Sequence, residues 1–360
     1  MPVDLLLDSF RKRVPWSTMR AILKMCNLPV ARGWEDTITK LMAKSQGEND
    51  LEDNFVRLKE LYCDYLLIGE KAIKLFSVER QISDKLITLL KSQQLKTTVF
   101  NETFPFPLSE EKLKEINNSI PELVEIKDFN DNLVLIFCTK RFFTERIEIN
   151  IEELTPEARK DLNNYDEVFG IRRYSRQFFD IVVLWKEINL LEIRVDIAHG
   201  MPSQERNKAF RQTIRAFDRL QTEFLGAEAL LQESINFFPL IDKLYESNEG
   251  RVCELGFTTD EGSTKFEKMR RDYVDLRTET YHKAGKLAVN HITPYHLAIL
   301  WKFPISEEIE TQPELLLPGH TRNLSNEQQH LDEILIKKCS CLEDYNFIFE
   351  KINIYLNNGG

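Results

Sequence analysis

The middle of the chain constrains the fold most, because it holds a series of short, β-branched and partly alternating segments. These segments are 132–138, 146–151, 168–174, 178–185 and 191–197. Alternation of apolar and polar residues with a period of two is typical of strands that bury one face. The short spacing between segments predicts an antiparallel sheet, with hairpin-like links at 139–144, 174–177 and 186–189.

The polar positions of these segments predict that one face of the sheet is in contact with water. The side chains that alternate with apolar residues are Glu148, Asn150, Glu192, Arg194 and Asp196. A Thr155-Pro156 pair predicts a helix that interrupts the strand series, since proline is favoured at the first helical position.

Helical patterns flank this region on both sides. Three short helices are expected within residues 3–45, the second with Ser17 as its N-cap. A longer helix at 51–76, with an interruption at Gly69 as the alternative, and another at 84–95 follow. Later helices are expected at 203–224, with Ser203 as N-cap, at 227–244 and at 264–282, and residues 295–301 resemble a strand. Two capping-box patterns, Ser325 with Gln328 and Ser340 with Glu343, predict the last two helices.

Together these patterns predict an α+β fold with a helical N-terminal module, an antiparallel β-rich middle and a helical C-terminal half containing a small additional strand region. Changes in the pattern of apolar and polar residues divide the chain into five expected parts. They are a basic helical module at 1–45, a helical segment at 46–96, a sheet domain at 97–200, a helical segment at 201–285 and a mixed region at 286–360.

Composition excludes several classes of protein. No stretch approaches the roughly 18 apolar residues of a membrane span, and the first residues lack the pattern of a signal peptide, so an intracellular place in cytoplasm or nucleus is expected. The six cysteines are scattered and form no CxxC pair, which favours a reduced compartment and no structural metal. No phosphate loop, nucleophile elbow or dinucleotide fingerprint is present, and no cofactor is expected.

Charge is distributed unevenly along the chain. The net charge is −10, yet residues 1–45 hold eight Lys and Arg against four Asp and Glu, for a net charge of +4. The rest of the chain carries −14. A small basic module attached to an acidic body suggests contact with an anionic partner through that module.

The segment Ser17-Thr-Met-Arg-Ala-Ile-Leu-Lys-Met-Cys-Asn-Leu-Pro-Val-Ala-Arg-Gly-Trp-Glu-Asp-Thr-Ile-Thr-Lys-Leu41 is the most distinctive pattern. It resembles the SAP family of DNA-associated helix-loop-helix modules. Its Asn27-Leu28-Pro29 turn and Gly33 match the loop of that family, although the glycine comes one place late and Trp34 stands where a lysine is common. Any small helical hairpin with a proline-containing turn would give a similar pattern, and that interpretation stays open.

The resemblance implies a core and a set of phosphate contacts. Core positions would be Met19, Leu23, Ile38 and Leu41, and the cations facing phosphates would be Arg20, Lys24, Arg32 and Lys40. The implied partner is nucleic acid, with DNA favoured by the family.

A second group of cations lies beyond this module. Basic and aromatic residues cluster at Lys140-Arg-Phe-Phe and Arg146, and again around Arg172, Arg173 and Arg176, a combination that can bind phosphates and stack bases. In the following helix Arg211, Arg215 and Arg219 fall on one stripe. The alternative is that the phenylalanines belong to the core and the stripe is an ordinary solvated face.

A catalytic alternative involves Asp180, Glu192 and Arg194. Restriction-type nucleases place one carboxylate on a strand and an acid-x-lysine on the next, so that two carboxylates hold a metal ion. Asp180 followed by Glu192-Ile-Arg194 has this arrangement, with arginine in place of the lysine. The same residues are also explained by alternation on a wet face.

Three hypotheses follow from the sequence. The first is a non-enzymatic protein that contacts the nucleic-acid backbone through the basic N-terminal module. The second is a protein-interaction subunit of a larger complex, which suits an acidic body with 23 phenylalanines and no catalytic signature. The third is a metal-dependent nuclease using Asp180 and Glu192. A membrane partner is not expected.

Overall fold

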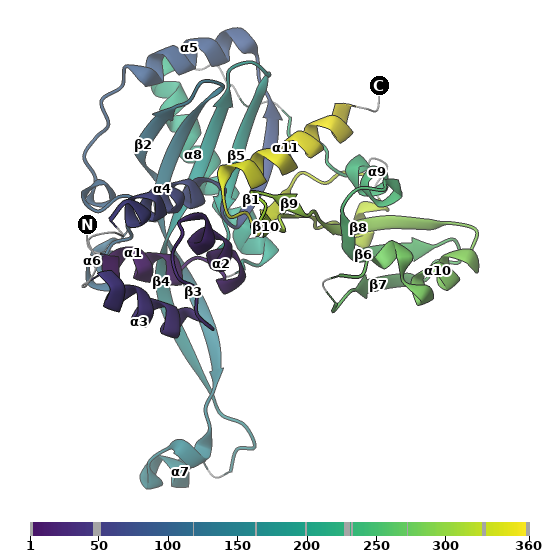
Figure 1. Ribbon diagram of the computed structural model, residues 1–360, viewed down its shortest axis with the longest axis horizontal. Coiled ribbons are helices and arrows are strands. Elements are labelled where there is room, and N and C mark those ends of the chain that lie inside the picture. The colour runs from purple at the N-terminus through teal and green to yellow at the C-terminus, as the bar shows by residue number, and fades with distance from the viewer. Residues whose placement is uncertain are drawn as a thin grey trace.

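Strands form the frame of the molecule and helices cover both sides of it (Figure 1). The computed structural model describes residues 3–45, 52–117, 119–162, 164–198, 200–226, 231, 233–271, 273–325 and 329–357. Helices and strands are both abundant in these residues, which confirms the predicted α+β class. In the same residues, no helix combines the length and the apolar character that crossing a membrane requires.

Ten strands form one antiparallel sheet, in the order β2-β3-β4-β5-β1-β12-β11-β8-β6-β7. Their bounds are β1 (Lys71–Ser77), β2 (Glu122–Asp128), β3 (Asn132–Glu148), β4 (Phe169–Trp185), β5 (Leu190–Asp196), β6 (Arg251–Thr259), β7 (Thr264–Lys268), β8 (Ile292–Leu300), β11 (Glu314–Leu317) and β12 (Ile334–Lys337). Two short strands, β9 (Phe303–Pro304) and β10 (Glu310–Thr311), pair separately. The sheet therefore extends well beyond the 97–200 region in which it is predicted.

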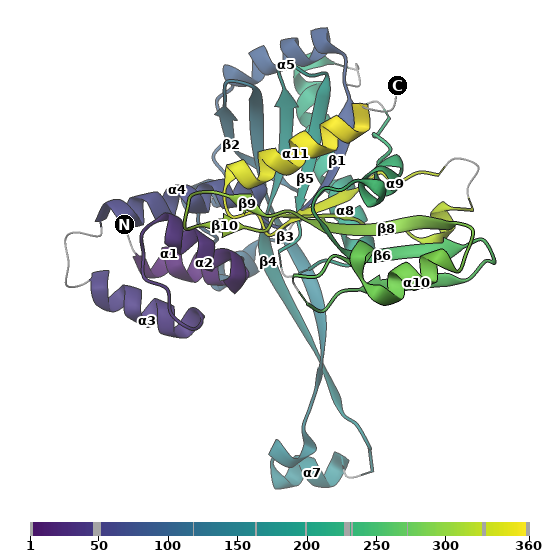
Figure 2. The same cartoon turned by 45° about the vertical axis from the view of Figure 1, so that its right-hand side comes forward.

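The helices come from every part of the chain. They are α1 (Val3–Arg11), α2 (Trp16–Met25), α3 (Trp34–Ser45), α4 (Glu52–Ile68), α5 (Arg80–Lys91), α6 (Glu110–Glu115), α7 (Pro156–Leu162), α8 (Ser203–Leu225), α9 (Pro239–Glu246), α10 (Thr280–Leu287) and α11 (Leu342–Asn357). Figure 2 shows α4 and α11 on one side of the sheet, with α8 on the other.

Two hydrophobic cores follow from this layering. On one face Leu58 and Tyr62 of α4 belong to the same buried cluster as Ile136 and Phe179 of the sheet. On the other face the aromatic residues of α8 pack with Leu135 and Phe178. Successive residues of β3 and β4 point to opposite cores, as the period of a strand requires.

β3 and β4 continue beyond the sheet as a two-stranded ribbon. They pair over their whole length, from Asn132↔Trp185 to Glu148↔Phe169, whereas β2 pairs with β3 only up to Cys138. On the other side β5 pairs with β4 only at 181–184. We call the ribbon at 139–148 and 169–178, with the connecting segment that carries α7, the arm, and it projects from the body (Figures 1 and 2).

The arm corrects two predicted hairpin links. Residues 139–144 and 174–177 lie inside the continuous strands β3 and β4. Their charged side chains suggest turns, but a ribbon that leaves the body can solvate charges along a strand without bending. The third predicted link, at 186–189, does connect β4 to β5.

The expectation of a wet sheet face is wrong for three of its five residues. Glu192, Arg194 and Asp196 are buried, because α1, α4 and α11 cover that face. Glu148 and Asn150 are exposed, since they lie at the outer end of the arm. Alternation therefore reports the strand period correctly, but not which face is solvated.

Several helix predictions also need correction. In the 51–76 segment the helix ends at Ile68, just before the Gly69 at which an interruption was the alternative, and β1 begins at Lys71. The 264–282 segment contains β7 and only the start of α10, because its apolar positions serve strand pairing with β6. In the 227–244 segment α9 begins at Pro239, while residues 227–230 and 232 lie outside the described residues.

The predicted caps differ as well. Ser17 and Ser203 lie inside the first turns of α2 and α8, and prolines immediately precede both helices. At α11 the backbone N–H of Ser340 donates to Asp344 Oδ2 at 2.7 Å, in place of the expected box with Glu343. Residues 326–328 of the Ser325 box lie outside the described residues.

Candidate nucleic-acid interface

A buried cluster of charges lies where the arm meets the body. Two carboxylates, Asp180 on β4 and Asp196 at the end of β5, face three cations, Arg13, Lys71 and Arg141. Arg13 pairs with Asp196, and Arg141 pairs with Asp180 while donating to the carbonyl of Asp196 at 3.1 Å. Lys71 lies 3.9 Å from Asp196. The cluster carries one more positive charge than negative, directly beneath a surface pocket described below.

Backbone and hydroxyl donors complete the cluster. Asp180 accepts from Thr213 Oγ1 of α8 at 2.8 Å and from the backbone N–H of Asp196 at 3.0 Å. Asp196 accepts from the N–H of Phe179 at 3.1 Å. The cluster therefore joins the turn after α1, β1, β3, β4, β5 and α8, and its carboxylates are fully engaged by hydrogen bonds.

Burial and the surrounding charges shift the pKa values of two groups in the cluster, Asp196 and Lys71. Burial alone would raise the pKa of Asp196, but the charges of Arg13 and Lys71 and the hydrogen bonds from Arg13 and the N–H of Phe179 outweigh it and hold that pKa well below its usual range. Burial lowers the pKa of Lys71 to about 8, although Asp196 opposes this shift. Lys71 is therefore the surplus cation of the cluster.

Replacing that surplus cation tests this assignment. We expect Lys71→Met to leave the free energy of unfolding at pH 7 within about 1 kcal/mol of wild type, or to raise it, since two arginines then balance two aspartates. The lowered pKa means that folding favours neutral Lys71, so the wild type should gain stability as pH rises from about 8 toward the ordinary lysine value near 10.4. The variant should lack this gain. Denaturant titrations at several pH values measure both, and a large loss at pH 7 would contradict the assignment.

A second buried pair lies further along the sheet. Arg194 donates to both carboxylate oxygens of Glu192, each at 2.9 Å, and to the carbonyl of Leu67 at 3.2 Å. Tyr345 of α11 donates to Glu192 Oε1, and the guanidinium of Arg194 lies 4.0 Å from the centre of its ring. This pair fixes α4 and α11 to the sheet.

These contacts bear on the nuclease hypothesis. Asp180 and Glu192 have no exposed surface, and each is occupied by an arginine. Among the described residues, no group of three acidic, histidine or cysteine side chains is arranged to hold a metal ion. The geometry of Asp180, Glu192 and Arg194 is that of ion pairs which stabilise the fold.

The arm-base pocket lies above the buried cluster and has a volume of about 850 Å³. Seven basic residues and one acidic residue, Glu110, line it. The basic residues are Lys12, Arg13, Lys114, Lys140, Arg172, Arg173 and Arg176. Seven consecutive residues of β4, 172–178, form one wall, because β5 has already left this edge of the strand.

The cations of β4 in this pocket are accessible. Arg172, Arg173 and Arg176 are exposed, and within the described residues none of them pairs with a carboxylate. Arg172 and Arg176 lie 5.8 and 4.9 Å from the ring centre of Tyr174, and Lys140 lies 4.9 Å from that of Phe142. The ring of Phe142 is 60% exposed. The pocket thus presents cations together with flat apolar rings.

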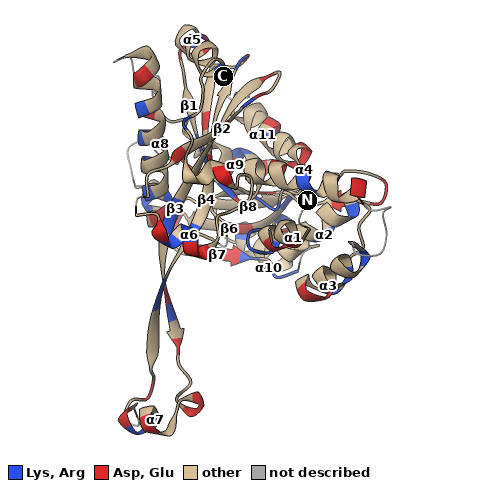
Figure 3. Ribbon diagram, turned by 90° about the vertical axis from the view of Figure 1, so that its left-hand side faces the viewer, with Lys and Arg blue, Asp and Glu red and all other residues tan. Residues whose placement is uncertain are grey.

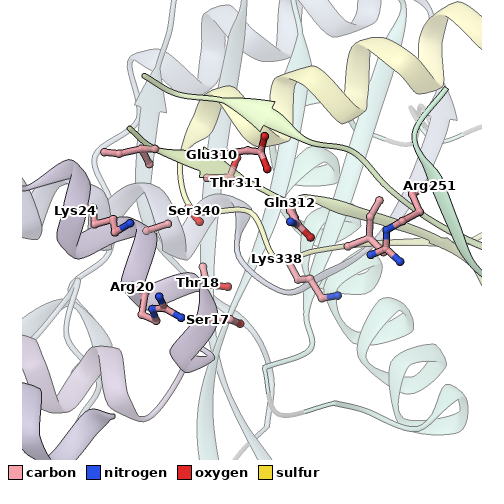
Figure 4. Close-up of a pocket in the computed structure, with 13 residues that line it drawn as sticks. Ser17, Thr18, Arg20, Lys24, Arg251, Glu310, Thr311, Gln312, Lys338 and Ser340 are labelled. Carbon is pink, nitrogen blue, oxygen red and sulfur yellow. The ribbon is translucent and has the colours of Figure 1, made fainter. Parts of the chain in front are cut away.

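A second pocket, of about 480 Å³, lies beside α2, and we call it the α2 pocket. Figure 4 shows Arg20 and Lys24 of α2 on one side of it and Lys338 and Arg251 on the other. Lys338 pairs with Glu314 at 2.6 Å. The hydroxyl groups of Ser17, Thr18, Thr311 and Ser340 and the carboxylate of Glu310 complete its polar lining, in which basic side chains outnumber the single acidic one.

The structure places the predicted SAP-like segment as two helices joined by a loop. Met19, Leu23 and Leu41 are buried and Ile38 is half-buried, as the resemblance implies. Membership of this segment in the SAP family stays a prediction.

The other predicted contacts lie apart from both pockets. Arg32 is exposed in the loop between α2 and α3, and Lys40 is exposed on α3. Arg211, Arg215 and Arg219 are exposed along α8, opposite the face that packs on the sheet. None of these five residues lines the arm-base pocket or the α2 pocket.

Sequence reasoning missed three cations of the arm-base pocket: Lys12, Arg13 and Lys114. The run Arg11-Lys12-Arg13 was a visible signal, but nothing local indicates that it meets β4, more than 150 residues later. Figure 3 shows basic residues where the two strands of the arm cross and acidic residues around α7 at its end.

Comparison with known proteins gives no match to a protein-family model and no match to a curated protein sequence.

Proposed function

We propose that this protein binds nucleic acid, with the phosphate backbone lying in the arm-base pocket. The observation that supports this most is the lining of a single pocket, in a chain whose net charge is −10, by seven basic residues, five of them exposed, and one acidic residue. A surplus of cations against an acidic background concentrates positive potential at one place. A polyanion gains most at such a site, because it releases its bound counterions on binding.

The aromatic rings favour a single strand over a duplex. Phe142 and Tyr174 lie among the arginines, and the exposed ring of Phe142 has a face on which an unpaired base can stack. Stacking needs no particular base, so the proposed binding depends little on sequence. No bond is made or broken in this proposal, and the protein acts by binding.

The basic N-terminal module contributes to both pockets. Lys12 and Arg13 follow α1 and line the arm-base pocket, whereas Arg20 and Lys24 of α2 line the α2 pocket. We infer that Lys12 helps to hold the strand, whereas Arg13 is engaged by Asp196 in the buried cluster. Arg20 and Lys24 make a separate phosphate contact, as the SAP-like pattern implies. The arm-base pocket is the main site in this proposal because its cations are more numerous.

The test is fluorescence anisotropy of labelled single-stranded and duplex oligonucleotides, of DNA and RNA, at several salt concentrations. We expect the triple change Arg172→Ala, Arg173→Ala and Arg176→Ala to weaken single-strand binding by about tenfold or more at low salt. It should also reduce the slope of log affinity against log salt by about 2, since each phosphate contact contributes roughly 0.7 for a single strand.

A matched control removes the same charge elsewhere. Lys85, Lys265 and Lys283 are exposed and lie outside both pockets, so their change to alanine should leave affinity nearly unchanged. The pair Arg20→Ala and Lys24→Ala should have a smaller effect than the arm triple. Equal losses in the control and the arm triple, or affinity that is insensitive to salt, would contradict the proposal.

A role as a protein-interaction subunit is the second candidate. The observation that favours it is the arm itself, which extends away from the body and ends in an acidic, exposed segment that a polyanion would repel. Isolation of the chain with a stoichiometric protein partner and without affinity for any of the oligonucleotides would favour this candidate.

A further inference from the structure

The outer arm exposes an unusual amount of apolar surface. Ile171 is 70% exposed and Tyr165 is 61% exposed, and Ile147 and Phe169 nearby are also exposed. With Phe142 they make five large apolar side chains within 30 residues that no part of the described body covers. Single exposed apolar residues are ordinary, but a concentration of them on one projecting element is typical of an interaction surface.

The end of the arm carries the opposite charge to its base. Residues 149–168, which we call the arm tip, contain six acidic residues and two basic ones, for a net charge of −4. All six acids are exposed: Glu152, Glu153, Glu157, Asp161, Asp166 and Glu167. One of the two cations, Arg159, donates to the backbone carbonyls of Glu152 and Leu154. The tip is therefore an acidic surface with little internal compensation.

The charges of the tip and of the arm-base pocket are complementary, yet they do not meet within one chain. The ribbon runs straight away from the body, so the tip points away from its own pocket (Figures 1 and 3). A second copy of the chain can present its pocket to the tip. Attraction between an acidic tip and a basic pocket then acts twice, once for each arm.

We propose that two copies of this protein exchange arms, the acidic tip of each occupying the basic arm-base pocket of the other. The contact is the same in both directions, so it closes as a two-fold dimer and does not extend into a fibre. It brings the exposed apolar residues of each arm, Ile147, Phe169 and Ile171, against the body of the other copy. It also occupies the cations assigned above to nucleic acid, so arm exchange and nucleic-acid binding exclude each other.

A charge-reversal pair tests the exchange without nucleic acid. The tip variant carries Glu152→Lys, Glu153→Lys and Glu157→Lys, and the pocket variant carries Arg172→Glu, Arg173→Glu and Arg176→Glu. The tip variant alone has a tip of net charge +2 and a basic pocket, whereas the pocket variant alone has an acidic tip and a pocket with four basic and four acidic residues. Neither variant keeps the attraction, so each should be monomeric by light scattering coupled to size exclusion. Mixed in equal amounts, they should form a heterodimer, because the acidic tip of the pocket variant then meets the unchanged basic pocket of the tip variant. The wild type should be dimeric at about 0.05 M salt and dissociate at about 0.5 M.

Controls separate this result from misfolding and from a different partner. All six changed residues are exposed, so circular dichroism and thermal unfolding should match wild type. Reversal of three exposed acids outside the arm, Glu79, Glu261 and Glu307, should leave the dimer intact. A monomeric wild type at low salt, a dimer that survives either reversal, or a mixture that stays monomeric would overturn the proposal. Because this experiment contains no oligonucleotides, a failed exchange leaves the nucleic-acid proposal standing. A dimer that binds no oligonucleotide would overturn only the nucleic-acid proposal.

Discussion

Changing Asp196 to alanine should lower the free energy of unfolding by about 3–5 kcal/mol, the cost of breaking a buried ion pair by removing one partner. The substitution leaves Arg13 and Lys71 in the interior without the carboxylate that faces both. It also removes the acceptor for the backbone N–H groups of Phe179 and Ala198. Denaturant unfolding at pH 7 measures the loss. Asp161→Ala, at an exposed position of the arm tip, is the matched control and should change stability by less than about 0.5 kcal/mol.

The acid dependence of stability gives the same prediction a second measurement. The pKa of Asp196 is held below its usual range in the folded protein, so its contribution is fully present above the ordinary aspartate value near 3.9. That contribution is lost as pH falls below this value toward the folded pKa. The variant should therefore lose less stability than wild type between about pH 4 and pH 2. Identical acid profiles, or a loss at pH 7 below about 1 kcal/mol, would mean that Asp196 does not hold the cluster together.

Arg194→Met should also be strongly destabilising, by about 3–5 kcal/mol, because Glu192 then stays buried with no cation. The hydroxyl of Tyr345 remains as one donor to this carboxylate, but a single neutral hydrogen bond does not replace two charge-assisted bonds. Tyr345→Phe is the milder comparison. It removes only the hydroxyl, so a loss of about 1–2 kcal/mol is expected.

The double variant Glu192→Leu with Arg194→Met distinguishes a penalty for unpaired charge from a general loss of packing. With both charges gone, the double variant should be more stable than Arg194→Met alone, and close to wild type. Denaturant unfolding of the four proteins in the cycle gives the coupling energy. Losses that simply add would show that the ion pair contributes little of its own.

The sequence predicts the strands of the middle region well because their signal is local. The period of two in β3, β4 and β5 follows from side chains that alternate between two faces, and that pattern is visible without any knowledge of partners. The same holds for α1 to α3, whose apolar spacing and breaks at Pro15 and Gly33 are local features. β1 was missed because its seven residues continue the apolar pattern of α4.

Continuity of β3 and β4 was not predictable for a different reason. Charged runs such as Lys140-Arg141 and Arg172-Arg173 suggest turns if charged side chains are assumed to reach water only where the chain bends. The pairing that makes them strands joins positions up to 53 residues apart, as in Asn132↔Trp185, and no local pattern contains it. The arm, and with it the exposure of Phe142 and Ile171, follows only from that pairing.

By itself, the sequence determined the three helices of residues 3–45, most of the strand segments of the middle region, and where charge accumulates along the chain. Only the tertiary structure decided which charges are buried and which meet. Glu192 and Asp196 alternate with apolar residues just as solvated side chains do, yet α1, α4 and α11 cover them and arginines neutralise them. Lys12 and Arg176 are separated by most of the N-terminal half and still line one pocket. The physical reason is that secondary structure follows from neighbours along the chain, whereas burial and electrostatic contact follow from neighbours in space.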